Sequence, residues 1–201
     1  MSRTRYTRYE RAWHWLQALV ILGLLGTGLE LHAPERVGLL GFRRALDVHL
    51  VLGAVLLLNA ALALFQFLVS GAIERYLPRP REVFTLSWLQ ARYYLRGIFA
   101  GEPHPIARGP LNPLQQVTYL AILNLLLPAQ VLTGVAMWGL DRWPALIERL
   151  GGLGVLLPLH TLLAWFFAAF LVAHVYLTTT GETPLANLRS MLGGDEGGAA
   201  P

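Results

Sequence analysis

The 201-residue sequence contains no cysteine and no lysine, and only 14% of its residues are charged. The absence of cysteine excludes disulfides, thiolate metal sites, iron–sulfur clusters and covalently attached haem. Soluble domains have about 25% charged residues, whereas 55% of this chain is hydrophobic. This balance is typical of a membrane protein whose metal chemistry, if any, uses ligands other than cysteine.

Charged side chains are missing altogether from residues 12–29, 48–69, 114–140 and 153–177. Three of these stretches are long enough to cross a bilayer core of about 30 Å, and flanking residues can complete the first. The first stretch lacks the cleavage site and short apolar region of a signal peptide, so we expect it to be a true span. Because lipid offers no hydrogen-bond partners to the backbone, the stretches are expected to be helices.

We therefore predict an all-α fold, an integral membrane four-helix bundle that forms a single domain over residues 1–201. The expected spans are residues 12–31, 47–69, 113–140 and 153–178, with a flexible tail at 193–201. In the first connection, Asp47 is expected to cap the second span. The second connection contains "REVFTLSWLQARYYLRGIF", an amphipathic segment expected to form a helix that lies on the membrane surface or packs on the end of the bundle.

The placement of arginine predicts the orientation of the chain. Eleven of the sixteen arginines lie in the N-terminus, the second connection and the tail, and five lie in the other two connections. By the positive-inside rule both termini are expected to be cytoplasmic. The net charge of +4 then reflects topology and contact with lipid headgroups, and no nucleic-acid partner is expected.

Four histidines stand in or at the ends of the predicted spans. His160 and His174 lie fourteen residues apart in "LHTLLAWFFAAFLVAH", so on a helix they share one face, about 40° apart, and are separated by about 21 Å. With both termini inside, His49 lies near the depth of His160 toward the periplasm, and His14 near the depth of His174 toward the cytoplasm. We call His49 and His160 the outer pair, and His14 and His174 the inner pair.

Two neutral imidazoles that face each other across a bundle can supply both axial ligands of a haem iron, so we predict two b-type haems. Zinc and copper fit less well, because cysteine is absent and only three methionines occur. Each histidine alone also fits a hydrogen-bonded residue near a helix end. The two remaining histidines, His32 and His104, are expected to be solvated.

Other residues can complete a haem site. Gly53 lies one turn beyond His49 on the same face and can leave room for a porphyrin, although close helix packing explains it equally well. Glycines that can serve in the same way are Gly26, Gly28 and Gly134. Haem propionates can bind Arg43 or Arg44 outside and Arg11 inside.

At these residues the chain resembles the four-helix, di-haem cytochrome b subunits of membrane-bound formate dehydrogenases, NiFe hydrogenases and thiosulfate reductases. The matching segments are "RAWHWLQAL", "HLVLG", "NPLQQVTYLAIL", "LTGVAMW", the His160/His174 spacing and "TTTGETPLANLRSML", which cover most of residues 10–192. The formate dehydrogenase and thiosulfate reductase branches look closest. In that family the histidine of the first helix pairs with the second histidine of the fourth, in agreement with the inner pair.

The resemblance implies a multi-pass protein of the bacterial inner membrane that passes electrons between a periplasmic redox subunit and menaquinone or ubiquinone. The subunit would be a molybdenum or NiFe enzyme, an iron–sulfur protein or a c-type cytochrome. The resemblance also implies a quinone pocket beside the inner haem, formed by Asn112, Gln115 and His174, with Gln116 and Tyr119 as neighbours. Asn112 before Pro113 equally fits a helix N-cap and first turn.

The sequence contains no nucleophile motif, phosphate loop or paired carboxylate site. We therefore expect an electron-transfer subunit of a quinone-linked oxidoreductase complex, with substrate chemistry done elsewhere. An alternative is a stand-alone quinone-linked oxidoreductase whose outer haem is reduced directly by a small periplasmic molecule such as superoxide. A third possibility is a transporter or scaffold whose histidines are polar packing groups.

Overall fold

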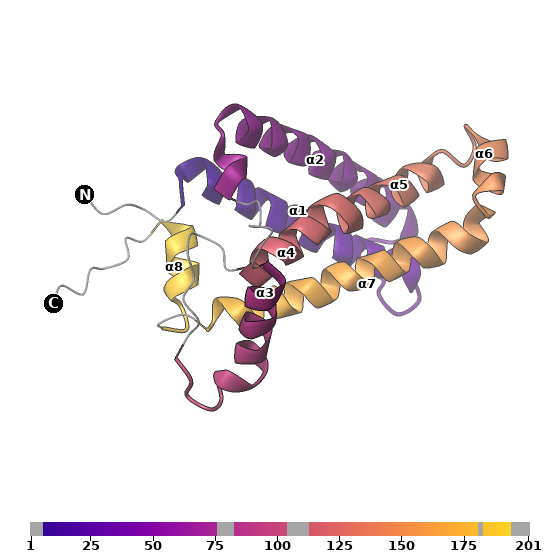
Figure 1. Cartoon of the computed structure of the whole chain (residues 1–201). Coiled ribbons are helices and arrows are strands. Elements are labelled where there is room, and N and C mark those ends of the chain that lie inside the picture. The colour runs from indigo at the N-terminus through magenta and orange to yellow at the C-terminus, as the bar shows by residue number, and fades with distance from the viewer. Residues whose placement is uncertain (1–5, 76–82, 104–112, 181–182, 194–201) are drawn as a thin grey trace. The chain divides into compact units, whose positions relative to one another are not determined.

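The computed structural model describes residues 6–75, 83–103, 113–180 and 183–193, and within them all regular structure is helical (Figure 1). Four helices are long and apolar enough to cross a membrane: α1 (Arg8–His32), α2 (Phe42–Val69), the continuous helix Leu114–Trp138 and α7 (Gly152–Thr178). The predicted all-α membrane fold with four spans is therefore confirmed. The first two helices begin before the predicted residues 12 and 47.

The contacts between residues divide the chain into two compact units, residues 1–63 with 130–201 and residues 64–129. The first unit contains α1, most of α2, most of α5 (Leu127–Trp138), α6 (Pro144–Arg149), α7 and α8 (Ala186–Leu192). All four histidines of the outer and inner pairs belong to this unit. The assignment of a single domain stays a prediction.

A capping box starts α1 at Arg8. The hydroxyl oxygen of Thr7 accepts a hydrogen bond from the backbone N–H of Glu10 at 3.1 Å, and the carboxylate of Glu10 accepts one from the backbone N–H of Thr7 at 2.7 Å. These two bonds satisfy amide groups that have no partner inside the first turn of a helix. The helix therefore begins before the uncharged stretch does.

The start of α2 is set by Glu30, at the far end of α1. Oε1 of this buried side chain accepts hydrogen bonds from the backbone N–H groups of Leu40 and Gly41, at 2.8 and 2.7 Å. Gly41 has a φ of 83°, a conformation that side chains other than glycine rarely adopt, and α2 begins at the next residue. Asp47 therefore lies inside the helix, and the prediction that it caps the second span was wrong.

Within the first unit, α1 approaches α2 closely. A Cβ atom on Gly23 would lie 2.7 Å from Cδ1 of Leu52, so only glycine fits there without a shift of the leucine. Further along the same contact, Nδ2 of Asn59 donates a hydrogen bond to Oε1 of Gln17 at 2.7 Å. Small residues and hydrogen bonds between side chains are the usual means by which helices associate in a membrane.

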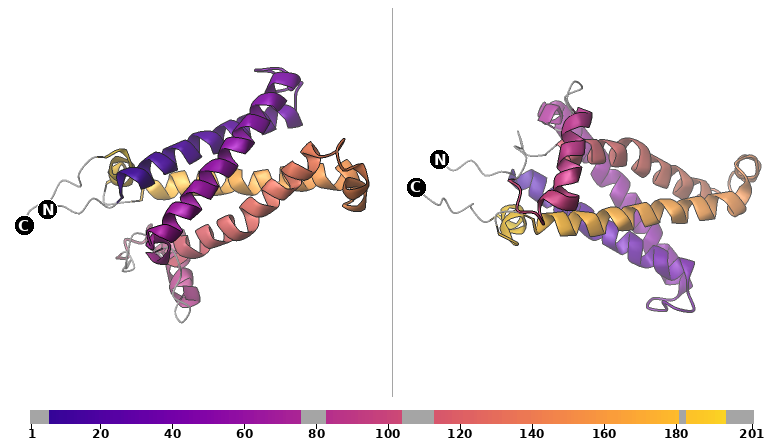
Figure 2. Two further views of the ribbon diagram at one scale, coloured as in Figure 1. Left: turned by 90° about the horizontal axis from the view of Figure 1, so that it is seen from above. Right: turned by 60° about the horizontal axis from the view of Figure 1, so that its bottom comes forward.

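The two ends of the chain meet within the first unit. The indole N–H of Trp15 donates a hydrogen bond to the carbonyl oxygen of Met191 at 3.0 Å, which fastens α8 to the beginning of α1. Figure 2 shows α1 and α7 meeting at the end of the unit that carries α8 and diverging toward its other end. Both ends of the described chain therefore lie at the same end of the unit, as an even number of membrane crossings requires.

The second unit contains the connection between the second and third spans. Its helices are the 3₁₀ turn Ala72–Arg75, α3 (Val83–Arg92), a π-helical turn Tyr93–Gly97, α4 (Pro113–Ala121) and a second π-helical turn Ile122–Leu126. In α3, Val83 and Gln90 are buried, whereas Phe84 and Trp88 are exposed. The helix packs on α4, so the predicted amphipathic helix is present and one face of it is covered within this unit.

A proline accounts for the second π-helical turn, which divides α4 from α5. Pro128 is the second residue after this turn, and its ring would clash with the carbonyl group of Asn124 in a regular α-helix. A wider turn relieves that clash without ending the helix. The third span therefore remains continuous from Leu114 to Trp138.

Candidate functional site

In the structure, the two histidines of each predicted pair lie close to each other. In the outer pair, the ring centroids of His49 on α2 and His160 on α7 are 6.3 Å apart, with their planes at 68°. In the inner pair, those of His14 on α1 and His174 on α7 are 6.1 Å apart, at 47°. All four side chains are partly buried. Their role as iron ligands stays a prediction.

These separations fit two axial ligands of one iron. Imidazole nitrogens bind metals at about 2.0 Å, and the ring centroid lies roughly 1.1 Å behind the nitrogen, so two rings on opposite sides of a metal have centroids about 6.2 Å apart. Each ring plane contains its own metal–nitrogen axis, so the angle between the planes can take any value. Both pairs therefore fit a haem iron in distance and in donor chemistry.

A haem also explains why two protein ligands suffice at each site. Among the described residues, no group of three or more His, Cys, Asp or Glu side chains could hold a metal ion. A porphyrin supplies four nitrogen ligands of its own, so the protein needs to add only the two axial ones. The two-histidine arrangement is thus suited to haem.

In the outer pair, His49 contacts two consecutive residues of α1. Its Nδ1 lies 2.8 Å from the hydroxyl oxygen of Thr27, which is also 2.7 Å from the carbonyl oxygen of Gly23. A Cβ atom on Gly28 would lie 3.4 Å from Cε1 of His49. The imidazole is thus positioned by the threonine hydroxyl and by the bare backbone of the next residue.

His160 has the same surroundings on α5. Its Nδ1 lies 2.8 Å from the hydroxyl oxygen of Thr133, which is 3.0 Å from the carbonyl oxygen of Gln130. A Cβ atom on Gly134 would lie 3.3 Å from Cε1 of the ring. In addition, Nε2 of Gln130 lies 3.1 Å from Nε2 of His160, so the glutamine amide is expected to turn away when this nitrogen binds a metal.

The inner pair has aromatic neighbours instead. The ring of Phe170, one turn before His174 on α7, stacks on it with centroids 5.6 Å apart. The ring of Trp15 meets His14 edge to face at 5.3 Å. Among the described residues, buried Nδ1 of His14 has no hydrogen-bond partner. A buried polar nitrogen without a partner is costly, and coordination or a hydrogen bond to a bound group would remove that cost.

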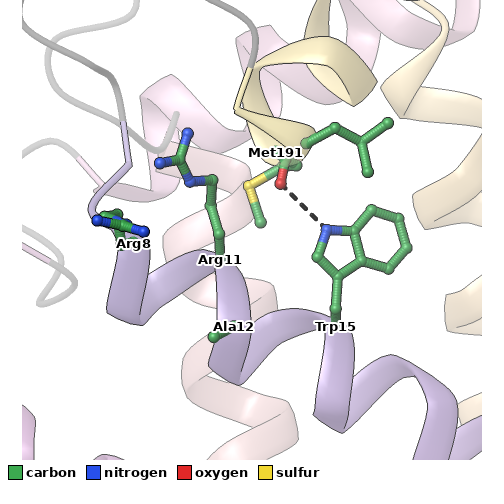
Figure 3. Close-up of a pocket in the computed structure, with 6 residues that line it drawn as sticks. Arg8, Arg11, Ala12, Trp15 and Met191 are labelled. Carbon is green, nitrogen blue, oxygen red and sulfur yellow. Dashed lines mark hydrogen bonds between the residues drawn. The ribbon is translucent and has the colours of Figure 1, made fainter.

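Arg11 lines a hollow of about 370 Å³ at the beginning of α1. The other residues around it are Arg8, Ala12, Trp15, Met191 and Leu192. Figure 3 shows the guanidinium groups of Arg8 and Arg11 extending from α1 on the side where α8 is fastened by the Trp15 bond. The hollow thus offers two cations within two turns of His14, and an acidic group would be attracted to it.

The structure also locates the remaining predicted haem residues. A Cβ atom on Gly53 or Gly26 would have no neighbour within 4 Å, so the backbone leaves open space at both positions. Arg43 and Arg44 are exposed at the start of α2, and Arg43 forms an ion pair with Asp47 at 3.5 Å. Such exposed pairs contribute little to stability, so Arg43 remains available to another anion.

The predicted quinone residues are described only in part. Asn112 lies outside the described residues, as does His104. Gln115, Gln116 and Tyr119 are partly buried on α4 of the second unit, whereas His174 belongs to the first unit. The quinone pocket stays a prediction. His32, expected to be solvated, is exposed.

Three polar residues of the outer site were not singled out from the sequence: Thr27, Thr133 and Gln130. Their neighbours in space lie on other helices, and a single sequence does not show which helices touch. One signal was present, because inside the predicted spans the dipeptide Thr-Gly occurs only at 27–28 and at 133–134. Each copy lies near the end of a predicted span that faces the outer histidines.

Comparisons with known proteins identify the family of the chain. The family model described as prokaryotic cytochrome b561 matches residues 5–194. A relative from Escherichia coli (strain K12), "Putative cytochrome YdhU", is 34% identical over 198 residues, which cover 94% of this chain and 72% of the relative. No solved structure matches the chain. The match over nearly the whole length and the histidine geometry lead to one conclusion: the chain belongs to the prokaryotic cytochrome b561 family.

Proposed function

We propose that this protein carries electrons through two b-type haems, one at the outer pair and one at the inner pair, between a periplasmic redox partner and quinone at the cytoplasmic side. As a member of its family, the chain is a multi-pass protein of the bacterial inner membrane that transfers electrons across it through haem b. The number of haems, their ligands, the partner and the quinone side belong to the proposal.

The observation that carries the proposal is the pair of ring separations, 6.3 and 6.1 Å, at two levels of one unit. His49 and His160 would bind one iron from both faces, and His14 and His174 the other. Bound haem supplies a one-electron couple between ferric and ferrous iron. Because α7 contributes a ligand to each site, its helical rise separates His160 from His174 by about 21 Å, and this one helix connects the two levels.

Other residues of the chain would hold the edges of the cofactors. Arg11 lies one turn before His14 on α1, beside Arg8 and the hollow at the helix start, and its guanidinium can bind an inner-haem propionate through two parallel hydrogen bonds. At the outer level Arg43 or Arg44 would serve in the same way. The open space beside Gly53 would accommodate part of the outer macrocycle.

Quinone would bind near the inner haem, at Asn112, Gln115 and His174. Reduction of menaquinone or ubiquinone consumes protons, and its carbonyl groups need hydrogen-bond donors close to an aqueous proton source. A cytoplasmic end of the bundle meets both needs. This assignment rests on the resemblance to di-haem subunits and on the amide side chains at the start of the third span.

A partner would exchange electrons with the outer haem. A molybdenum or NiFe enzyme, an iron–sulfur protein or a c-type cytochrome could dock on the short connections near residues 33–41 and 139–151. Mild-detergent purification of the native protein tests this. A stoichiometric redox subunit is expected to accompany the chain, whereas a chain that purifies alone and reduces quinone with superoxide would support the stand-alone oxidoreductase.

The haem assignment is tested by replacing one ligand of each pair in the full chain. We expect wild-type protein to contain two b haems in its reduced-minus-oxidised spectrum, His49→Ala to lose only the outer haem and His14→Ala only the inner one. Exposed His32 provides the matched control, and His32→Ala should retain both. A chain that keeps two haems after either ligand is replaced would contradict the pairing.

A further inference from the structure

We propose that Thr27 and Thr133 lock both imidazoles of the outer pair in a single tautomer and thereby lower the reduction potential of the outer haem. The proposal deepens the proposed function and rests on a haem at His49 and His160. The two threonines act through the histidines, so they are positioning residues and do not touch the iron.

Counting protons at Thr27 fixes the direction of its hydrogen bonds. A hydroxyl group has one proton to donate, and Thr27 donates it to the carbonyl oxygen of Gly23 at 2.7 Å. The carbonyl oxygen of Leu24, at 3.3 Å, is a second acceptor near the same proton. With that proton directed to backbone carbonyls, the contact of the hydroxyl oxygen at 2.8 Å to Nδ1 of His49 must be one in which the threonine accepts. Nδ1 of His49 carries the proton, and Nε2 keeps a free lone pair.

Thr133 repeats this arrangement. Its hydroxyl donates to the carbonyl oxygen of Gln130 at 3.0 Å, so at 2.8 Å its oxygen accepts from the Nδ1–H of His160. The amide of Gln130 is compatible with the same tautomer, because its Nε2 lies 3.1 Å from Nε2 of His160 and can donate to that nitrogen when it is unprotonated. Both rings thus present Nε2 as the free ligand.

The adjacent glycines leave room for the same rings. A Cβ atom on Gly28 or Gly134 would lie 3.4 or 3.3 Å from Cε1 of His49 or His160, so a side chain at either position would crowd the ring whose Nδ1 is held by a hydroxyl. Nδ1 of His14, in the inner pair, has no such bond to a described residue. No hydroxyl group of the described residues hydrogen-bonds to His174 either, so the hydroxyl effect applies to the outer haem.

A hydrogen bond donated from the second ring nitrogen makes a metal-bound imidazole more basic. A more basic ligand stabilises ferric iron relative to ferrous iron, so it lowers the reduction potential of the haem. Two such bonds act on the outer iron, one from each face. Removing either hydroxyl should raise the potential of that haem alone.

The test is a redox titration of the purified full-length holoprotein, followed by the absorption of the two b haems. Thr27→Val and Thr133→Val keep the side-chain shape and remove the hydroxyl. In each we expect the equilibrium for reduction of the outer haem to shift about tenfold toward ferrous iron, equivalent to about 59 mV for one electron. The inner haem should not change.

Thr27→Ser and Thr133→Ser provide the rescue, because serine retains the hydroxyl, and both should keep the wild-type potential. Thr118→Val is the matched control: its hydroxyl also donates to a helical carbonyl, that of Leu114 at 2.8 Å, but no histidine hydrogen bond to it is present among the described residues. This variant should leave both potentials unchanged.

Two results would overturn the proposal. One is a valine variant with full haem content and an unchanged outer potential. The other is loss of the outer haem in both the valine and serine variants, because the role would then be packing. Loss of the outer haem in a valine variant, with normal haem content in the matching serine variant, would support the proposal. Failure of the proposed function is distinguishable, since His49→Ala would then remove no haem.

Discussion

At the scale of single residues, the two histidine pairs have different surroundings. The outer histidines are held by hydroxyl groups and by glycine backbone, whereas the inner histidines are held by the aromatic rings of Phe170 and Trp15. A hydroxyl adds a directional bond to Nδ1, and an aromatic ring adds only contact. Two haems bound at these pairs, as we propose, would thus have different reduction potentials.

Gly28→Ala and Gly134→Ala are expected to weaken haem binding at the outer pair. The added methyl group would lie 3.4 or 3.3 Å from Cε1 of the neighbouring histidine, so the ring must move by a few tenths of an ångström. Changes that disturb the support of a ligand lower metal affinity about 10-fold or more. Haem per chain, measured by pyridine haemochrome after competition with apomyoglobin, should fall toward one.

Gly154→Ala is the control for these two variants. A Cβ atom there would have no neighbour within 4 Å, so haem content should stay at two per chain. The glycines would have no special role if Gly28→Ala and Gly134→Ala retained the outer haem as firmly as Gly154→Ala.

At the scale of helices, the contact between α1 and α2 combines close backbone approach with one buried amide pair. Because Gly23 has no side chain, Leu52 can pack against it. Gln17 accepts a hydrogen bond from the buried side chain of Asn59. Lipid tails are as apolar as leucine, so burial alone gives little drive for helices to associate in a membrane. The amide pair supplies a directional bond and fixes the register of the two helices one turn from His14.

A double-mutant cycle on this pair should give a measurable coupling energy. Asn59→Leu and Gln17→Leu each leave one amide without its partner, whereas the double variant leaves none. We expect a coupling of about 0.6 kcal/mol and at most about 1.7 kcal/mol, the range found for hydrogen bonds between membrane helices. Unfolding of the holoprotein by sodium dodecyl sulfate titration measures it, and strictly additive single effects would show that the bond contributes nothing.

At the scale of the whole molecule, the number of spans and the placement of arginine determine topology. Four helices are long enough to cross the membrane, and an even number returns the chain to its starting side. Eleven arginines lie in the N-terminus, the second connection and the tail. The positive-inside rule then favours both ends in the cytoplasm, with the outer pair near the periplasm.

Because the chain has no cysteine, single cysteines can report this topology without background labelling. Glu35 lies in the first connection and Thr179 just beyond α7, and both are exposed. In intact spheroplasts, a membrane-impermeant maleimide should label Glu35→Cys and not Thr179→Cys, and it should label both after the membrane is opened. The reverse pattern would mean that the inner pair faces the periplasm.

How much could be predicted differs between the spans and the site. The third span was predicted to within two residues of its end, whereas the start of α2 at Phe42 was not, because Glu30 stabilises it from another helix through Leu40 and Gly41. The histidine pairs were predicted because depth follows from position along a span. Their hydrogen-bond partners were not, because which faces of two helices touch depends on packing.

The sequence by itself determined that the chain crosses the membrane as helices, because an uncharged stretch in lipid must satisfy its own backbone. It also determined two levels of histidine, because helical rise converts fourteen residues into about 21 Å. Only the tertiary structure decided that Thr27 meets His49 and Thr133 meets His160. Those contacts join residues on different helices, and they arise from interhelical packing, which no local periodicity encodes.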